Sequence, residues 1–348
     1  MGGAEAKQLS RTGLLLINLG TPDAPDTRSV RRYLREFLSD PRVIDIPAPL
    51  RALLLNAVIL PFRPRKSAAA YQKIWDADGS PLLKNGIALR EALKKSLGSG
   101  YRVELGMRYG NPSLGQALDK LRSSGCERIV VLPLFPQYAS SSTGSALERV
   151  YSLAGSRWNT PALDVVPAFF EHPDFIACLA DIAGPEIRSF EPDHLLMSYH
   201  GLPERQIRKS DEASSHCLRA ANCCAEMSQS NRWCYRAQCF ETSHLLARAL
   251  GRDESSYSVS FQSRLGRTPW ISPFTDLRIP ELASAGVRRL AVICPSFTAD
   301  CLETLEEIGI RAAEQWTAVG GEALRLIPCL NASPRWVESI AGWVRERA

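Results

Sequence analysis

The sequence predicts an α/β protein built from two similar doubly wound lobes, each with a parallel sheet. Short apolar runs of strand length alternate with amphipathic helical stretches, and this alternation is typical of parallel sheets covered by helices. The runs span residues 14–18, 103–106, 128–134, 195–198, 258–261 and 290–294. A second observation is that parts of the first half recur in the second half.

Three blocks recur in the same order. The first run leads to Gly20 and Pro22, and its counterpart leads to Gly201 and Pro203. The other two blocks are Tyr101, Val103, Arg108 and Gly110 with Tyr257, Val259, Arg264 and Gly266, and Gly125, Arg128, Val131 and Thr143 with Gly286, Arg289, Val292 and Thr304. Any doubly wound fold gives some similarity of this kind, but ordered blocks favour duplication. We place the lobes at residues 1–165 and 166–348, with ligands in a cleft at the carboxyl ends of the strands.

Composition narrows the classes of function. The 42 Lys and Arg against 37 Asp and Glu leave a scattered charge of +5, so we expect no nucleic acid partner. No apolar run reaches 18 residues; the longest candidate, residues 50–62, is interrupted by Arg51 and Asn56. The opening MGGAEAKQLSRTG lacks an apolar signal core, so we expect a cytoplasmic protein. The helical stretch 50–62 could touch a partner or the inner membrane peripherally, or cover a ligand.

His200 is the first candidate for chemistry. It follows the apolar run LLMSY and precedes Gly201-Leu202-Pro203, so we expect it at the tip of a strand where the chain turns sharply. A histidine in this position points into the cleft or bonds to the backbone of the turn. Both alternatives remain open from the sequence.

Glu303 is the second candidate. It follows the run LAVIC and a short loop, in the first turn of a helix, where the helix dipole alone could explain a carboxylate. Glu303, Glu306 and Glu307 lie on neighbouring faces of that helix, so at least one of the three should face solvent. The recurrence equates Thr304 with Thr143, which puts Glu303 beside the cleft. An imidazole and a carboxylate facing one cavity suit a transiently bound divalent metal and the removal of protons.

Seven ordered motifs resemble the signature set of the ferrochelatase family. They are NLGTPDAP (18–25), SDPRVIDIP (39–47), GMRYGNPS (106–113), LPLFPQYASSSTGSA (132–146), SYHGLPER (198–205), FQSRLGRTPWISPFTD (261–276) and DCLETLEE (300–307). Together they cover the chain from about residue 12 to 345. The resemblance implies a porphyrin cleft between the lobes and insertion of ferrous iron into protoporphyrin IX, the final step of haem biosynthesis.

The resemblance also implies roles for individual residues. It makes His200 a proton acceptor and metal ligand, and Glu303 a metal ligand and proton relay. The porphyrin contacts that it implies are Tyr71, Arg108, Tyr109, Tyr138, Ser140, Ser141 and Thr143. Coproporphyrin remains an alternative substrate, and a monomer and a homodimer are both compatible with the sequence.

Two positions depart from the family's common pattern. Many relatives carry His two residues before the glutamate, whereas this chain has Cys301, which removes one proton relay or replaces it with a thiol. Where some relatives have a cluster-ligating Cys near the Ser-rich loop, this chain has Ser140. His200 is therefore the only imidazole at a strand tip of the expected cleft.

Half of the ten cysteines lie close together in an insertion at residues 211–240. They are Cys217, Cys223, Cys224, Cys234 and Cys239. Four thiolates can hold zinc or an iron–sulfur cluster, and spacing alone does not decide between them. Some microbial ferrochelatases resemble this chain in carrying a [2Fe-2S] cluster in such a segment, which favours the cluster.

We favour Cys217, Cys224, Cys234 and Cys239 as the cluster ligands, with Cys223 as the replacement for Cys224. Cys217 and Cys224 are seven residues apart and would share the face of a helix, whereas Cys223 would point elsewhere. The cluster would pin the insertion or sense redox state.

Two rival functions remain. A cobalt or nickel chelatase acting on another tetrapyrrole would use a related fold, but the FQSRLG and PWISP stretches resemble the iron enzyme. A haem or iron–sulfur sensor that kept the fold and lost the chemistry would explain Cys301, but His200 and Glu303 are intact.

Overall fold

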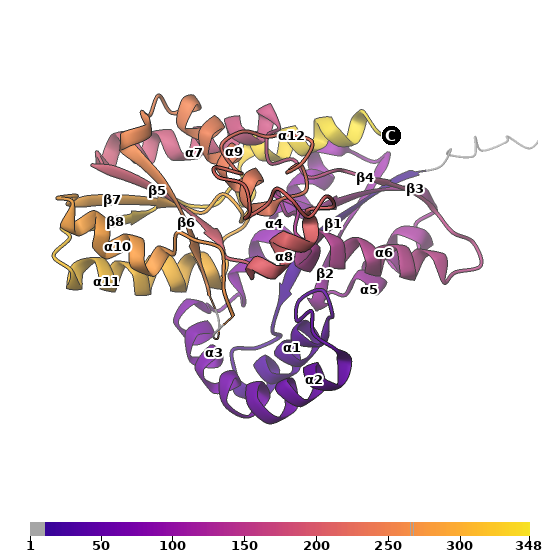
Figure 1. Ribbon diagram of the computed structural model, residues 1–348. Helices are drawn as coiled ribbons and strands as arrows, with labels where there is room; N and C mark the ends of the chain where they lie inside the picture. Colours follow the sequence, from indigo (N-terminus) through magenta and orange to yellow (C-terminus); the bar gives the residue numbers. More distant parts are fainter. Residues whose placement is uncertain (1–10, 265, 267) are drawn as a thin grey trace, which may run out of the picture.

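Each lobe is built on one four-stranded parallel sheet in the computed structural model, which describes residues 11–264, 266 and 268–348 (Figure 1). The first sheet has the order β2-β1-β3-β4 and the second the order β6-β5-β7-β8. The strands are β1 Arg11–Thr21, β2 Tyr101–Gly110, β3 Cys126–Pro133, β4 Ala162–Val165, β5 His194–His200, β6 Tyr257–Gln262, β7 Arg289–Ile293 and β8 Ala323–Leu326. The predicted α/β fold with two similar doubly wound lobes is confirmed.

The pairing registers confirm the internal recurrence. In β1, Leu14 lies between Val103 and Val130, and its counterpart Leu195 in β5 lies between Tyr257 and Ala291. On β7 the partner of Leu195 is Ala291, the residue that the recurrence predicts. On β6 the recurrence predicts Val259 as the partner, but Tyr257 takes this place. A shift of two residues keeps the same side chains on the same face of the sheet, so the outer strand slides without turning over.

All six predicted strands form, and the two edge strands β4 and β8 were missed. Each edge strand has only four residues, and their sequences, ALDV and ALRL, are mostly half-buried rather than apolar throughout. Short strands without an apolar run give no sequence signal that distinguishes them from loops.

Helices cover both faces of each sheet. The helices of the first lobe are α1 Thr27–Ser39, α2 Ala48–Leu53, α3 Leu60–Ile74, α4 Pro81–Leu97, α5 Leu114–Ser123 and α6 Ser145–Gly155, with the π-helices η1 Leu54–Ile59 and η2 Ser140–Gly144. Leu14 and Leu16 of β1 join one core cluster with α4, whereas Leu15 and Ile17 join another with α5 and α6. All four side chains are completely buried, as expected for an interior strand of a parallel sheet that helices cover on both faces.

The remaining helices belong to the second half of the chain. They are α7 Pro173–Phe190, α8 Glu204–Ser210, α9 Tyr235–Ala249, α10 Thr275–Ser284, α11 Ala313–Ala318 and α12 Pro334–Arg345, with the 3-10 helix η3 Glu254–Ser256 and the π-helix η4 Glu303–Ala312. In β5, Met197 faces the cluster that also contains Leu14, whereas Leu196 faces α10, η4 and α11. One core cluster therefore contains side chains from both sheets.

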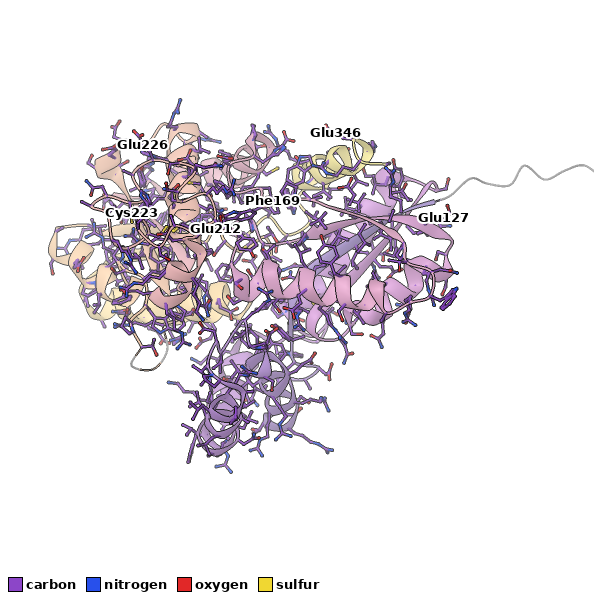
Figure 2. The ribbon with its side chains drawn as sticks, turned by 45° about the vertical axis from the view of Figure 1, so that its right-hand side comes forward. Glu127, Phe169, Glu212, Cys223, Glu226 and Glu346 are labelled. Atoms are coloured by element: carbon purple, nitrogen blue, oxygen red, sulfur yellow. The ribbon has the colours of Figure 1, made fainter. Side chains whose placement is uncertain are left out.

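The last helix, α12, runs along the top of Figure 1 and packs on α4 of the first lobe. The Ser96 hydroxyl donates to the Glu338 carboxylate over 2.9 Å, and Arg345 donates to the carbonyl of Ser96 over 3.0 Å. Phe169, which lies between the lobes in Figure 2, stacks against Trp336 and Trp343. These three aromatic side chains, which we call the aromatic seam, belong to the core cluster that also contains Leu89 and Leu93 of α4, so α12 joins the two lobes. The division at residue 165 stays a prediction.

The helices α1, α2 and α3 form the projection at the bottom of Figure 1. The predicted helical stretch 50–62 lies here, across α2, η1 and the start of α3. Four apolar side chains of this projection are strongly exposed: Leu50, Leu53, Val58 and Phe62. None of the described helices has the length and apolarity needed to cross a bilayer.

Candidate active site

His200 is the last residue of β5, as predicted for a strand tip. Its Nδ1 lies 2.6 Å from the carbonyl oxygen of Gly201, so this nitrogen carries the proton and donates it. Its backbone N–H donates to the Ser296 hydroxyl over 3.3 Å. The ring is therefore bonded to the turn, and the same bond leaves the lone pair of Nε2 available to accept a proton or bind a metal.

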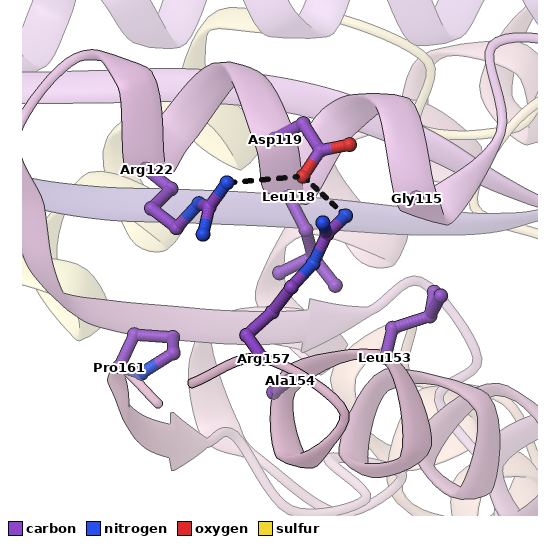
Figure 3. A pocket seen from close by; sticks show the side chains of 8 residues that line it. All are labelled: Gly115, Leu118, Asp119, Arg122, Leu153, Ala154, Arg157 and Pro161. Carbon is purple, nitrogen blue, oxygen red and sulfur yellow. Dashed lines mark hydrogen bonds and ion pairs between the residues drawn. The ribbon is translucent and has the colours of Figure 1, made fainter. Parts of the chain in front are cut away.

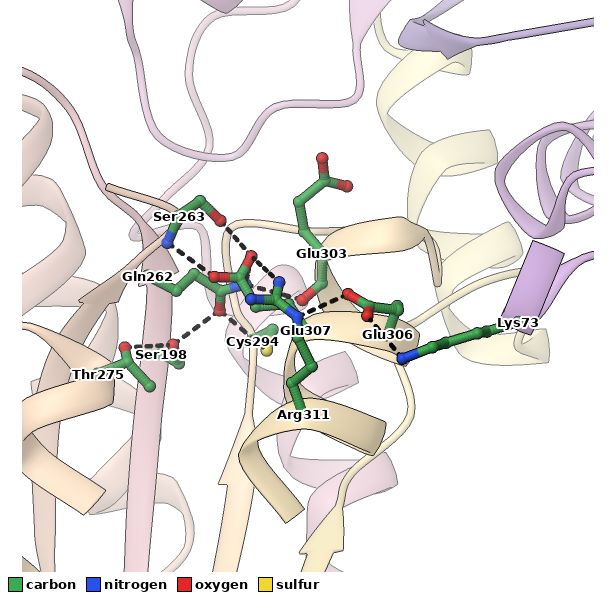
Figure 4. Close-up of polar contacts among 10 residues, drawn as sticks. All are labelled: Lys73, Ser198, Gln262, Ser263, Thr275, Cys294, Glu303, Glu306, Glu307 and Arg311. Atoms are coloured by element: carbon green, nitrogen blue, oxygen red, sulfur yellow. Dashed lines mark hydrogen bonds and ion pairs between the residues drawn. The ribbon is translucent and has the colours of Figure 1, made fainter. Parts of the chain in front are cut away.

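Glu303 opens the π-helix η4, and its two neighbours have partners of their own (Figure 4). Glu306 is buried and pairs with Lys73 of α3 over 3.4 Å and with Arg311 over 2.8 Å. Glu307 accepts from the Ser263 backbone over 2.9 Å and from the Ser263 hydroxyl. None of the three carboxylate side chains is exposed, so the expectation that at least one of Glu303, Glu306 and Glu307 faces solvent is wrong. In Figure 4 the Glu303 carboxylate points away from the other two.

The surroundings of Glu303 come mostly from α3. Burial lowers the pKa of the Arg63 guanidinium, while the nearby Glu303 carboxylate and the Tyr71 phenol raise it in part. Burial and the Glu303 carboxylate together raise the pKa of Tyr71 well above its ordinary value. Tyr71 therefore stays a neutral phenol beside Glu303, and Arg63 supplies the nearby positive charge. Sequence analysis did not single out Arg63, which carries no motif.

Cys301 lies in the same group. Burial and then the neighbouring Glu303 carboxylate raise the pKa of this thiol well above its ordinary value. The thiol keeps its proton at neutral pH, so Cys301 does not replace a histidine as a proton acceptor.

Arg108 and Tyr109 belong to a buried cluster centred on Asp40. The Asp40 carboxylate accepts from Arg108 over 2.5 Å, from Tyr109 over 2.8 Å and from Ser145 over 2.6 Å. Burial acts to raise the pKa of Asp40, but the hydrogen bonds from Ser145, the Arg42 backbone and Tyr109, with the charge of Arg108, hold it below its ordinary value. Asp40 and Ser145 thus engage the Tyr109 hydroxyl and the Nε and Nη2 of Arg108.

The loop after β3 carries the other predicted porphyrin contacts. The Tyr138 backbone N–H donates to the Gln238 side chain over 2.7 Å, and its ring packs against Trp233 with centroids 5.1 Å apart. Ser140 accepts from Arg42 over 2.9 Å, and Ser141 is half-buried beside it. The buried Thr143 hydroxyl has no hydrogen-bond partner among the described residues, so it has capacity for a ligand.

A cavity of about 590 Å³ lies between this loop and the second lobe. It is lined by Pro41, Arg42, Asp45, Tyr138, Ala139, Ser140, Leu202, Gln206, Ile207, Lys209, Ser210, Glu212, Arg232, Trp233 and Tyr235. A second hollow, between α5 and α6, holds only about 20 Å³ and is dominated by the Asp119 pairs with Arg122 and Arg157 (Figure 3). Of these two hollows, the first has the volume that an organic ligand needs.

The cysteine segment lies between α8 and α9, where Cys223, Glu212 and Glu226 mark it in Figure 2. Residues 211–234 contain neither helix nor strand, so the predicted helix carrying Cys217 and Cys224 is wrong. Positive φ angles at Leu218 (59°) and Asn222 (53°) turn the chain between them, which a helix forbids.

The turns gather the thiols instead. The sulfurs of Cys223 and Cys224 are 3.8 Å apart, and Cys217 and Cys224 both interact with Cys234. Cys239 is completely buried on α9, near Cys224. Arg236 donates to the Cys224 sulfur over 3.0 Å. Within the described part of the chain, no three His, Cys, Asp or Glu side chains are arranged so that they could hold a metal ion as they stand.

Gln262 and Asp40 are further residues that sequence reasoning missed. Gln262, the last residue of β6, bonds to main-chain atoms on both sides of the site. Its place at the end of a predicted strand, opposite the strand of His200, was the available signal.

Comparison with known proteins identifies the family. The family model described as Ferrochelatase matches residues 11–348. The ferrochelatase of Coxiella burnetii (strain Dugway 5J108-111) is 52% identical over 335 residues, which cover 96% of this chain and 93% of that protein. The ferrochelatase of Legionella pneumophila (strain Paris) is 49% identical over 337 residues, covering 97% and 99%.

Among solved structures, SirB from Bacillus subtilis with Fe3+ has the same fold at a TM-score of 0.54 and 13% identity, covering 97% of this chain and 96% of that one. The sirohydrochlorin chelatase SirB from the subspecies spizizenii, in complex with cobalt, gives 0.54 and 11%. These likenesses concern the fold alone. With a family model that matches almost the whole chain and relatives near 50% identity, this chain belongs to the ferrochelatase family.

Proposed function

We propose that this chain inserts ferrous iron into a porphyrin, with protoporphyrin IX as the substrate. Its membership of the ferrochelatase family carries the proposal, because the match extends over the whole described length. Coproporphyrin is the alternative, and the test below includes it. The cobalt and nickel chelatase rival rests only on the fold shared with SirB, at 13% identity.

Metal insertion requires a group that accepts protons. The porphyrin loses two pyrrole protons as the iron takes their place on the nitrogens, so the charge of the macrocycle and the charge of the metal balance. The free lone pair of His200 Nε2 suits proton acceptance, because Nδ1 is already committed to Gly201. The Glu303 carboxylate, which points away from Glu306 and Glu307, suits the approach of a cation.

Porphyrin contacts follow from the same surroundings. Tyr71 borders Glu303, and the Thr143 hydroxyl lacks an internal partner, so these two support direct contact with the macrocycle. Tyr138, Ser140 and Ser141 would contact it from the loop after β3. We assign Arg108 and Tyr109 an indirect part, since Asp40 and Ser145 occupy their polar atoms.

The test is anaerobic turnover with ferrous iron, following the loss of porphyrin fluorescence with protoporphyrin and with coproporphyrin. We expect turnover with protoporphyrin, and a loss of at least about 100-fold in kcat for His200→Ala, because general acid–base catalysis contributes factors of that size. His244→Ala, which changes an exposed histidine on α9, is the matched control. Turnover with coproporphyrin but not with protoporphyrin would make coproporphyrin the substrate. No turnover with either porphyrin would overturn the proposed function.

We also propose that the cysteine segment holds a [2Fe-2S] cluster. The donor set supports it: Cys217, Cys223, Cys224 and Cys234 are neighbours, and Arg236 and the Leu218 backbone already donate to sulfur atoms. The ligand set that we favour is completed by Cys239. Cys223 is the alternative to Cys224 as one of the four ligands. The segment lacks helix and strand, so it can adjust to a bound group, whose binding energy would then fix its fold.

The readouts for the cluster are visible absorbance and the iron and acid-labile sulfide content of protein purified without oxygen. We expect two irons per chain and their loss in Cys217→Ser and Cys234→Ser, with Cys178→Ser as a buried control on α7. Zinc in place of iron, or unchanged iron in both variants, would overturn the cluster.

The projection of α2, η1 and α3 supports a peripheral membrane contact. Leu53 and Phe62 expose 64% and 74% of their surfaces, which an aqueous surface disfavours. Sedimentation with vesicles of anionic lipid should bring down the protein, and Leu53→Ser with Phe62→Ser should abolish this. Equal sedimentation of the double variant would contradict the contact.

A further inference from the structure

We propose that Gln262 is a positioning residue that fixes Glu303 relative to His200. The proposal rests on the proposed function and concerns how its two reacting side chains are held. Gln262 ends β6 and is 3% exposed, so its amide is committed to internal partners. Those partners belong to both sides of the site.

The main chain of Gln262 supports the histidine. Gln262 is the direct register partner of His200, and its carbonyl accepts the backbone N–H of Gly201 over 2.8 Å. The carbonyl of Gly201 in turn accepts the His200 Nδ1 proton over 2.6 Å. A Cβ on Gly201 would lie 2.8 Å from the Gln262 carbonyl oxygen, so this turn needs glycine. The orientation of the imidazole thus depends on the Gln262 peptide.

The side chain of Gln262 supports the glutamate (Figure 4). Its Nε2 donates to the main-chain carbonyl of Glu303 over 2.7 Å, and its Oε1 accepts from the Ser198 hydroxyl over 2.7 Å. Because Glu303 is the first residue of η4, this bond fixes the point from which the carboxylate extends. π-Helical segments recur at functional sites, where they redirect side chains that a regular helix would place elsewhere.

The first lobe contains the same kind of bond. Arg108 lies in β2 between the register partners of Asn18 and Gly20, so it faces Leu19, the counterpart of His200. Its Nε donates to the carbonyl of Ser145, at the end of the π-helix η2, over 3.1 Å. Both bonds join the outer strand to a π-helical segment, but at different positions, because Thr143 corresponds to Thr304 and Ser145 therefore to Glu306. In the second lobe a neutral amide makes the bond, so the outer strand itself brings no positive charge to Glu303, whose nearby charge comes from Arg63.

The test compares Gln262→Met, which has nearly the same volume and no donor, with Gln262→Glu, which keeps the acceptor for Ser198 and replaces the donor with oxygen. Ser258→Ala on the same strand is the control, because it removes the buried bond to His194 at the opposite end of the sheet. For both Gln262 variants we expect kcat to fall at least about 10-fold with the porphyrin KM within about 2-fold, since misplacing a reacting group costs rate more than binding. Ser258→Ala should keep both values.

A second readout does not depend on activity. Hydrogen exchange of the amides from Glu303 to Glu307 should accelerate at least about 10-fold in the Gln262 variants and remain unchanged in Ser258→Ala. Normal kcat, or a raised KM at normal kcat, would overturn the proposal, as would unchanged exchange. If Gln262→Met does not fold, Gln262→Glu carries the same test. If the wild type shows no turnover, the proposed function fails, and the exchange result alone decides whether Gln262 holds Glu303.

Discussion

The two lobes share one fold, but they differ in the polar side chains at the ends of their strands. In the first lobe, Arg108 reaches the π-helical segment and pairs with Asp40, so charge is neutralised inside the protein. In the second, Gln262 makes a bond of the same kind without charge, to the carbonyl of Glu303, and His200 stands where the first lobe has Leu19. The difference indicates that duplication supplied a common framework, in which the second lobe alone carries the histidine and the glutamate of the proposed reaction.

The largest expected effect comes from disrupting the buried Asp40 cluster of the first lobe. Asp40→Asn removes the charge that Arg108 requires and should lower the free energy of unfolding by about 3 kcal/mol, because it leaves a buried cation unpaired. Urea denaturation followed by circular dichroism measures the change.

The control is Glu148→Gln, which removes the exposed partner of Arg42 and should cost less than about 1 kcal/mol. If Asp40→Asn and Glu148→Gln proved equally stable, the Asp40 cluster would not be what holds this end of the first lobe together.

Acidification sharpens the comparison, because the second lobe has the buried His194 where the first has Gly13. Burial, with the charges of Arg278 and Arg252, lowers the pKa of His194 from 6.5 to about 4. The unfolded chain therefore takes up a proton at a higher pH than the folded one. Between pH 6.5 and about 4 the free energy of unfolding should fall by up to about 3 kcal/mol from this group.

The measurement is urea denaturation at several pH values, beside His194→Gln. The variant should have a flatter dependence of unfolding free energy on pH in this window. Parallel curves for the two proteins would show that His194 does not contribute.

The smallest expected effect concerns one of the ion pairs that join the lobes. Lys73 of α3 reaches the buried Glu306 of η4 over 3.4 Å, but the Lys73 side chain is 47% exposed. A double-mutant cycle with Lys73→Met and Glu306→Gln should give a coupling free energy below about 1 kcal/mol, because water screens such a pair. A coupling above about 2 kcal/mol would mean that this contact, rather than the shared core, joins α3 to the second lobe.

Strong periodic signals in the sequence predicted the fold. Six apolar runs became strands, and Glu303 opens a helix as expected. The ordered blocks also became equivalent positions, except that the block on β2 and β6 is shifted by two residues. The edge strands β4 and β8 were missed because four half-buried residues carry no distinctive pattern. The apolar run before His200 was enough to locate the end of β5, and the run and loop before Glu303 were enough to locate the start of η4.

The cysteine segment marks the limit of that reasoning. Seven-residue spacing predicted a helix for Cys217 and Cys224, whereas left-handed turns at Leu218 and Asn222 bring their sulfurs near Cys234. Spacing predicts contacts only where a regular element repeats, and this segment has none. Arg63 and Gln262 were missed for a related reason, since tertiary packing alone brings them to Glu303.

The aromatic seam of α12 has a consequence for synthesis. Translation completes the strands of the first lobe long before Trp336 and Trp343 leave the ribosome, yet these residues cover α4 and its neighbours. Until then a nascent chain exposes an apolar groove on its first lobe. A chain that ends at Ser333, before α12, should therefore be recognised by chaperones through the half that was made first.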